Sequence, residues 1–263
     1  MKVSELRKLF IDKNLLTEVL SYVLGISRSD VFKLNEVDVK TAKRVKRIAK
    51  KVNRGVPLAY VSGGVWFYDL PIMVNRHVLC PRHDTEILVY EVLQRLRGGE
   101  QVLDLCTGSG CIAIAIAKNS DARVFATDIS KKAVEVARKN AVMNEVVVSF
   151  DCGDLLDGQG VYDVIVSNPP YVRPPEIGAH DVGVFYEPRI AFDGGPDGLW
   201  FYRRIVADAH RHLRADGFLA MEIGYDQAED VRNLLASHNW CNIEIIKDLA
   251  SRDRVVIAKR GSE

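Results

Sequence analysis

The sequence predicts an α/β protein with a doubly wound, mostly parallel seven-stranded sheet, a small N-terminal helical domain and a β-hairpin connector. Three patterns support this prediction. β-branched runs alternate with helical stretches from residue 100 onward, apolar residues recur at helical spacing near the N-terminus, and two short apolar runs between these regions flank a turn. We therefore assign residues 1–55 to a helical bundle, 56–80 to the connector and 81–263 to the main domain.

The N-terminal bundle is expected to consist of short amphipathic helices. Apolar side chains recur every three or four positions from Leu6 to Leu24, and Gly25 can end that pattern. A further helix is predicted over residues 41–53, with an apolar stripe on one face and basic side chains on the other. In the connector, residues 65–68 and 72–74 are the predicted hairpin strands.

Seven short runs in the main domain predict its strands. Five of them alternate with helical patterns, which indicates a parallel sheet. The last two have no helical pattern between them, so we expect an antiparallel pair at one edge of the sheet. The predicted strands are 101–104, 123–127, 146–150, 162–167, 218–223, 243–247 and 255–258.

The composition is that of an ordinary globular protein, with 48% apolar and 27% charged residues in a chain of 263. The longest apolar run, 111–117, is far shorter than the roughly 20 residues that cross a bilayer. The N-terminus lacks the pattern of a secretory signal, and the five scattered cysteines show no metal-ligand spacing. We expect a cytoplasmic protein with reduced thiols, no membrane anchor and no metal.

Charge is unevenly distributed along the chain. Residues 1–76 contain 15 Lys and Arg against 7 Asp and Glu, whereas residues 77–263 contain 21 against 28. The stretch from Lys40 to Arg54 has several basic side chains and no acid. This stretch can be an ordinary solvated helix face, or it can attract an acidic protein or an RNA-containing partner.

A glycine-containing turn, Cys106-Thr107-Gly108-Ser109-Gly110, follows the first strand of the main domain. Glycines let a ligand approach the backbone, and a helix start offers free N–H groups, so we expect a nucleotide-like ligand here. Asp128 ends the second strand, where a carboxylate can accept hydrogen bonds from ribose hydroxyls, and Asp154 follows the third. The glycine pattern also fits a dehydrogenase. Asp104 before the turn favours S-adenosylmethionine, because an acid there is usual in methyltransferases.

The tetrapeptide Asn168-Pro169-Pro170-Tyr171 follows the fourth strand, at the carboxyl edge where α/β sheets bind ligands. A planar amino group conjugated to a carbonyl or ring is a poor nucleophile, so an enzyme must orient it. The Asn168 side-chain oxygen and the Pro169 carbonyl can accept its two hydrogens, and the Tyr171 ring can stack on it. Pro170 stiffens the segment. We expect direct N-methyl transfer here without a general base.

The tetrapeptide leaves four acceptors open: adenine N6, cytosine N4, guanine N2 and a glutamine amide. Enzymes that act on nucleobases must reach or flip the base and usually have a basic groove and a recognition domain. The main domain here is net acidic, and the predicted appendage is small. A non-catalytic binding protein with this fold also stays possible at this point.

Further motifs resemble one family closely. They include Tyr60-Val61-Ser62-Gly63, Pro81 to Glu86, Tyr186-Glu187-Pro188-Arg189, 194–199, Glu222-Ile223-Gly224 and Arg252-Asp253-Arg254. With the glycine turn and the tetrapeptide, they make the chain similar to the release factor glutamine methyltransferases, and the resemblance covers nearly the whole chain. It implies a Rossmann-like methyltransferase fold and methylation of the glutamine in the Gly-Gly-Gln motif of class 1 peptide chain release factors.

The resemblance also implies which residues bind which ligand. Cys106 to Gly110, Asp128, Asp154, Leu155 and Asn168 would bind S-adenosylmethionine and its product S-adenosylhomocysteine, and Asn168 to Tyr171 would bind the glutamine. The N-terminal helices would grip the release factor, with a monomeric enzyme and no direct binding of nucleic acid. A sister family that methylates a ribosomal protein shares the Cys106-containing turn and is the nearest alternative.

A few other side chains have two interpretations each. Glu187 can line the acceptor channel or be an ordinary loop carboxylate. Arg82 and Glu86 can pair with each other or lie at the mouth of the site. The three tryptophans, Trp66, Trp200 and Trp240, are expected to pack in the interior rather than to stack on a ligand.

Overall fold

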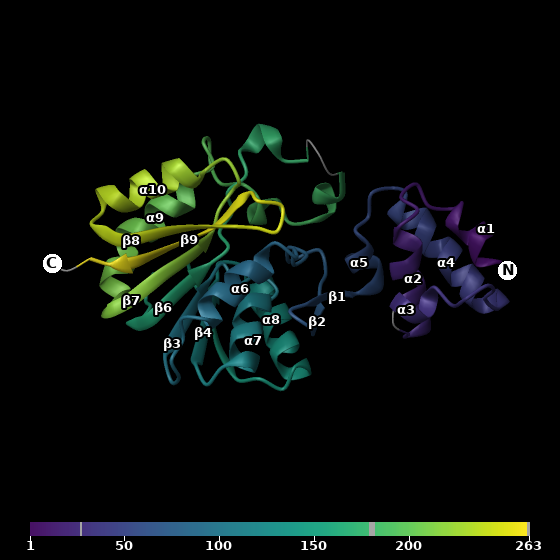
Figure 1. Ribbon diagram of the computed structural model, residues 1–263, viewed down its shortest axis with the longest axis horizontal. Helices are drawn as coiled ribbons and strands as arrows, with labels where there is room; N and C mark the ends of the chain where they lie inside the picture. Colours follow the sequence, from purple (N-terminus) through teal and green to yellow (C-terminus); the bar gives the residue numbers. More distant parts are fainter. Residues whose placement is uncertain (27, 179–181, 262–263) are drawn as a thin grey trace.

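The computed structural model describes residues 1–26, 28–178 and 182–261. Figure 1 shows a lobe of N-terminal helices beside a larger α/β body. Between the two lie helix α5 (Leu58–Ser62) and the hairpin of β1 (Gly64–Phe67) and β2 (Leu70–Met73). The chain thus passes from the lobe through the hairpin into the body.

The N-terminal lobe contains α1 (Val3–Arg7), α2 (Leu15–Leu24), α3 (Arg28–Val31) and α4 (Val39–Val52) around its own buried core. The predicted stop is present, because Gly25 follows α2 in the left-handed region at φ 67°. Helix α4 begins two residues before its predicted start. The side chain of Asp38 accepts a hydrogen bond from Thr41 N at 2.9 Å and so caps the helix.

The hairpin joins β1 and β2 through a tight turn at Tyr68 and Asp69. Both residues have positive φ, 49° and 59°, as the common two-residue hairpin turn requires. Asn140 in α8 (Lys131–Met143) holds this hairpin to the body: its Oδ1 accepts from Met73 N at 2.8 Å, and its Nδ2 donates to Met73 O and to Ser109 O. The connector is therefore fastened to the glycine turn.

The body is built on a seven-stranded sheet in the order β5-β4-β3-β6-β7-β9-β8. Strands β3 to β7 are parallel, and β9 is antiparallel to both of its neighbours, which confirms the predicted doubly wound sheet and its antiparallel edge. The strands are β3 (Gln101–Leu105), β4 (Arg123–Asp128), β5 (Val148–Cys152), β6 (Tyr162–Ser167), β7 (Leu213–Glu222), β8 (Trp240–Lys247) and β9 (Asp253–Arg260).

The prediction for the third strand was wrong by two residues at each end. Residues 146 and 147 still belong to the turn after α8, because Glu145 adopts a positive φ of 57° and extends that turn. Strand β7 also begins five residues earlier than predicted. Its first part contains exposed polar residues, so it does not show the apolar run that marks a buried strand.

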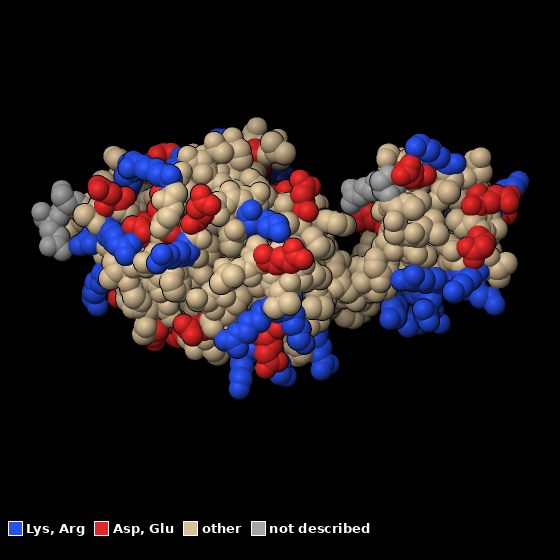
Figure 2. Space-filling model, turned by 90° about the horizontal axis from the view of Figure 1, so that it is seen from below, with Lys and Arg blue, Asp and Glu red and all other residues tan. Residues whose placement is uncertain are grey.

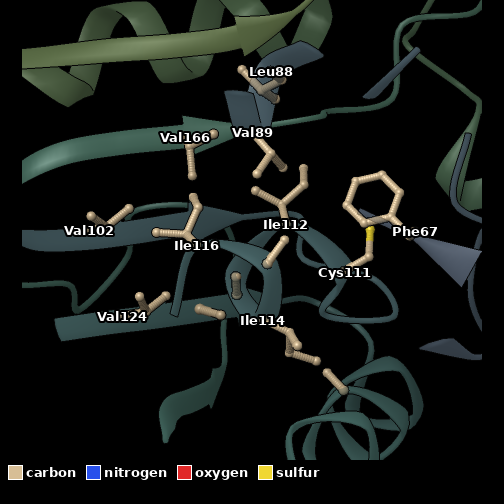
Figure 3. Packing of buried hydrophobic residues seen from close by; sticks show 14 of the residues in the cluster. Phe67, Leu88, Val89, Val102, Cys111, Ile112, Ile114, Ile116, Val124 and Val166 are labelled. Atoms are coloured by element: carbon tan, nitrogen blue, oxygen red, sulfur yellow. The ribbon is translucent and has the colours of Figure 1, made fainter. Parts of the chain in front are cut away.

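Helices cover both faces of the sheet. Helices α6 (Thr85–Leu93), α7 (Cys111–Asn119) and α8 pack on one face, and α9 (Trp200–Ala209) and α10 (Ala228–Ser237) pack on the other. Figure 3 shows Ile112 and Ile116 of α7 beside the strand residues Val102 and Val166, all of them at most 4% exposed. Neighbouring residues of a strand face opposite sides, so Leu103 and Leu105 belong to the other core.

The segment between β6 and α9 is an extended loop with three short 3-10 turns: η1 (Pro174–Glu176), η2 (Val182–Tyr186) and η3 (Arg189–Ala191). A fourth turn, η4 (His210–His212), follows α9. Of the helices that the structure describes, none combines the length and apolar character needed to cross a membrane. The loop lies over the carboxyl ends of the strands and forms part of the site.

Candidate active site

A cavity lies at the carboxyl ends of β3, β4 and β6, where the strand order of the sheet changes direction. Ligands bind at this place in open α/β sheets. Its wall combines the loops after these strands with the connector and with the start of α9. The lining residues are His77, Val78, Leu79, Cys106, Gly108, Thr127, Asp128, Ile129, Ser130, Ala133, Gly153, Asp154, Leu155, Asn168, Pro170, Pro188, Ile190, Ala191, Trp200, Phe201 and Arg204.

Asp128 organises the cofactor side of this cavity. Its two carboxylate oxygens accept hydrogen bonds from Gly108 N and Ser130 N, both at 2.8 Å. Burial raises the pKa of Asp128, and these two backbone donors counteract that rise. Each oxygen keeps a further lone pair, so the carboxylate can also accept from a diol in the cavity.

Asp104 is a fully buried acid beneath the glycine turn. Its Oδ2 accepts from Thr107 Oγ1 at 2.6 Å and from Ala113 N at 3.2 Å, and burial raises its pKa to about 7. Among the described residues, the buried atoms Asp104 Oδ1 and Thr127 Oγ1 have no hydrogen-bond partner. Buried polar atoms are normally paired, and Thr127 lines the cavity, so its hydroxyl can meet a polar ligand there, whereas Asp104 is not among the lining residues.

The remaining residues of the predicted glycine turn shape the loop from below. Thr107 and Ser109 are buried, and Gly110 precedes α7 with a φ of 81°. A β-carbon at Gly110 would lie 2.9 Å from that of Ala137, so the glycine lets α7 and α8 approach each other. Cys106 lines the cavity in the left-handed region at φ 58°. Because glycine adopts this backbone region without steric strain, a glycine would also suit position 106.

Asp154 and Leu155 line the cavity below the predicted place of the cofactor. The Asp154 carboxylate is held by both terminal nitrogens of Arg204, at 2.8 and 3.1 Å. Leu155 is 6% exposed and has a positive φ of 51°, which turns the chain after β5. The structure thus brings both residues to the site, with the Asp154 charge already paired.

On the acceptor side, Asn168 and Pro170 line the cavity, while Pro169 is buried between them. The Asn168 side-chain nitrogen donates to Glu222 Oε2 at 3.0 Å and to Thr85 Oγ1 at 3.2 Å. The Tyr171 hydroxyl donates to Glu222 Oε1 at 3.0 Å. The tetrapeptide is therefore anchored by its polar side chains.

Glu187 is not among the residues that line the cavity. It is 6% exposed, pairs with Arg82 at 2.6 Å, and accepts a hydrogen bond from Cys80 N at 2.8 Å. Of the two interpretations of Arg82 and Glu86, the structure does not show the pair, since Arg82 pairs with Glu187 and Glu86 pairs with His83 at 3.2 Å. Glu187 instead ties the loop after β6 to the segment after the hairpin.

The prediction that all three tryptophans pack in the interior holds only for Trp240. This residue is 5% exposed and its indole nitrogen donates to Val206 O at 3.1 Å. Trp200 is 52% exposed and lines the cavity, and Trp66 is 67% exposed on the hairpin. Periodicity places Trp200 at a helix start but does not show that this start faces a ligand.

Two residues of the site had no assigned role in the sequence. Thr85 and Glu222 occur in the family-like segments, but only the fold brings them to Asn168. The one signal was chemical: Glu222 is an acid that directly follows the apolar run 218–221 in the second half of β7. Within the described residues, no group of three or more His, Cys, Asp or Glu is placed to hold a metal ion.

Known proteins with similar sequences identify the family of this chain. The family model described as the methyltransferase small domain matches residues 83–181. A release factor glutamine methyltransferase from Thermodesulfovibrio yellowstonii is 39% identical over 254 residues, which are 93% of this chain and 91% of that protein. One from Clostridium acetobutylicum is 40% identical over 257 residues, which are 92% and 90% of the two chains.

A solved methyltransferase from Pyrococcus furiosus shares the fold, with a TM-score of 0.58, 22% identity, and coverage of 73% of this chain and 90% of that one. The fold and the site define a Rossmann-like methyltransferase that uses S-adenosylmethionine. With relatives this similar over most of its length, the chain belongs to the release factor glutamine methyltransferase family. The dehydrogenase interpretation of the glycine turn is thereby replaced.

Proposed function

We propose that this chain transfers a methyl group from S-adenosylmethionine to the side-chain amide nitrogen of the glutamine in the Gly-Gly-Gln motif of class 1 release factors. The observation that carries the proposal is the Asn168 amide. It lines the cavity, and its nitrogen is held by Glu222 and Thr85. Its oxygen can therefore accept a hydrogen bond from the amide of a substrate.

The chain contributes orientation rather than proton transfer before the methyl group moves. S-adenosylmethionine supplies a methyl group on a positively charged sulfur. The Asn168 Oδ1 and the Pro169 carbonyl accept the two N–H hydrogens of the glutamine amide and aim the remaining electron density at the cavity. Tyr171, held through its hydroxyl, offers its ring to the planar amide. The nitrogen loses its proton only after it has gained positive charge.

The cofactor role proposed for the opposite wall follows from its donors and acceptors. Asp128 offers free lone pairs for the ribose hydroxyls, and the backbone of Gly108 lies beside it at the turn. The hydroxyl of Thr127, which lines the cavity, adds a polar atom on the same side. Leu155 gives an apolar surface for the adenine.

The N-terminal lobe is the proposed grip on the release factor. Figure 2 shows Lys and Arg side chains gathered on one side of this lobe. In α4 and just after it, the exposed basic residues are Lys40, Lys43, Arg44, Lys46, Arg47, Lys50, Lys51 and Arg54. The Tyr186 hydroxyl donates to Arg54 O at 3.0 Å and so links the lobe to the loop over the site. We infer a monomeric, cytoplasmic enzyme that does not need to bind nucleic acid directly.

Transfer of a labelled methyl group tests this proposal directly. We expect the purified chain to label a purified release factor at the glutamine of its Gly-Gly-Gln motif, located by mass spectrometry. A release factor with asparagine at that position should stay unlabelled, because the shorter side chain does not place its nitrogen against Asn168. Label on a ribosomal protein or on RNA, with none on the release factor, would contradict the proposal and favour one of the alternative substrates.

A further inference from the structure

Glu222 is a buried carboxylate that meets three hydrogen-bond donors of the site. It ends β7 and is 2% exposed. Its Oε2 accepts from Thr85 Oγ1 at 2.6 Å and from Asn168 Nδ2 at 3.0 Å, and its Oε1 accepts from Tyr171 Oη at 3.0 Å. One carboxylate thus fixes both polar side chains of the tetrapeptide.

Three hydrogen-bond donors and a nearby cation surround Glu222. Burial raises the pKa of Glu222 above its usual value and the Asp84 carboxylate adds to that rise, whereas the Thr85 hydroxyl, the Arg254 guanidinium and the Tyr171 hydroxyl counteract it. Arg254 is itself 7% exposed and is held by Asp248 at 3.2 Å. A carboxylate that faces three donors beside a cation is stabilised in its ionised form.

The Glu222 carboxylate decides which way the Asn168 amide faces. The hydroxyl of Thr85 donates its hydrogen to Glu222, so both neighbours present oxygen lone pairs to Asn168. Only the NH2 end of the amide can meet two acceptors. Turning the amide over would place its oxygen against a buried carboxylate. Since the amide is planar, its oxygen points away from Glu222.

We propose that Glu222 is a positioning residue. It holds the Asn168 amide with its oxygen toward the substrate nitrogen that receives the methyl group, and it thereby selects a substrate group that donates an N–H hydrogen bond to that oxygen. The inference rests on the proposed transfer to an amide nitrogen. Glu222 acts through Asn168 and Tyr171 and does not itself touch the substrate nitrogen that is methylated. A neutral amide in place of the Glu222 carboxylate would allow the Asn168 side chain to turn over and present its nitrogen to the substrate.

The first test is Glu222→Gln, which preserves size. The introduced amide has one oxygen for three donors, and its own NH2 must face one of them, so Asn168 is free to turn. We expect kcat for release factor methylation to fall about 30- to 100-fold. The KM for the release factor should change by less than about threefold and the Kd for S-adenosylmethionine by less than about twofold, because no contact to either is removed.

The second test is rescue. Asn168→Asp places a carboxylate beside Glu222 and should strongly reduce transfer through repulsion of like charges. In the double variant Asn168→Asp/Glu222→Gln, the NH2 group of the side chain introduced at position 222 can donate to one oxygen of the introduced aspartate. The other oxygen of that aspartate then stays free to accept a hydrogen bond from the substrate amide. We expect the double variant to be at least about tenfold more active than Asn168→Asp alone. A merely structural role of Glu222 predicts that the two losses add.

Tyr202→Phe is the matched control for folding. The Tyr202 hydroxyl is buried and donates to the backbone carbonyl of Glu222 at 3.1 Å, so its loss disturbs the same strand end without touching Asn168. We expect a lower Tm with unchanged kcat. If Glu222→Gln does not fold, Thr85→Val replaces it in the kcat and KM measurement, because it removes the other acceptor of the Asn168 amide.

The wild-type assay separates the two ideas. No transfer to the release factor by the wild-type chain contradicts the proposed function. With an active wild type, a Glu222→Gln variant that retains full kcat, or a double variant no more active than Asn168→Asp, overturns the positioning role and leaves the proposed function in place.

Discussion

The two walls of the cavity are prepared for their ligands in different ways. On the acceptor wall, the side chains of Asn168 and Tyr171 are already bound to Glu222 within the protein. On the cofactor wall, Thr127 Oγ1 is buried and has no hydrogen-bond partner among the described residues, and neither has Asp104 Oδ1, which is buried beneath that wall. The acceptor wall is fixed by its own hydrogen bonds, whereas the cofactor wall keeps unused polar atoms.

This difference suits the two tasks. A glutamine amide must be held in one orientation during methyl transfer, and a preformed acceptor wall avoids the cost of reorganising at that moment. A cofactor with many polar groups is bound tightly when it satisfies buried atoms that were unpaired without it. Substitutions on the acceptor wall should therefore change kcat, and those on the cofactor wall should change affinity or stability.

The largest effect is expected for Asn168→Ala. This variant removes the acceptor that orients the substrate amide, so kcat/KM for the release factor should fall about 10²–10³-fold. The Kd for S-adenosylmethionine, measured by calorimetry, separates this loss from any contribution of Asn168 to cofactor binding. An unchanged kcat/KM with intact cofactor binding would show that the acceptor wall does not orient the amide.

Asp104 should make stability depend on pH. Burial raises its pKa to about 7, whereas a carboxyl group in the unfolded chain titrates near 4. Between these values the unfolded chain has lost a proton that the folded chain keeps, so stability falls as the pH rises through this window. From pH 5 to pH 8, the wild type should lose roughly 2–3 kcal/mol relative to Asp104→Asn.

Urea unfolding without cofactor at several pH values measures this difference. Asp151→Asn, at an exposed position of β5, is the control and should follow the wild-type curve. If the curves of wild type and Asp104→Asn run parallel over the whole range, the buried acid is ionised in the folded protein, and the cofactor wall does not hold a neutral carboxyl group.

Much of the fold could be predicted from the sequence because the central strands are buried on both faces. Such strands contain short runs of β-branched residues, as at 164–166, and the helices between them set the parallel order. Helices α3 and α5 were not predicted, since four and five residues are too few to show a helical period. The polar first half of β7 was missed for a related reason: its side chains are exposed.

The residues of the site also divide into those that the sequence could bring together and those that only the fold brings together. Asp128 ends β4 and Asn168 directly follows β6, the two strands on either side of β3, so the rule for carboxyl ends of parallel strands brought them together in advance. Glu222 and Thr85 are 54 and 83 positions away from Asn168 in the sequence. They meet it because β7 pairs with β6 and α6 packs near β7, and local patterns contain no information about such pairing.

A smaller effect is expected for Asp128→Asn on the cofactor wall. The introduced amide can accept from only one of the two backbone donors, Gly108 N and Ser130 N, and loses the charge that strengthens hydrogen bonds to a diol. The Kd for S-adenosylmethionine should rise about 10- to 100-fold by calorimetry. With saturating cofactor, kcat should stay within about threefold, and a larger loss would mean that the two walls are not separable.

The smallest effect is expected for Asp154→Asn, the matched change on the same wall. Asp154 lines the cavity, but its carboxylate is already bound by both terminal nitrogens of Arg204. The pair is about one-third exposed, and ion pairs of this kind contribute little. The Kd for S-adenosylmethionine should change by less than about threefold. An effect as large as that of Asp128→Asn would show that the cofactor displaces Arg204, so that this part of the wall is rearranged by its ligand rather than prepared for it.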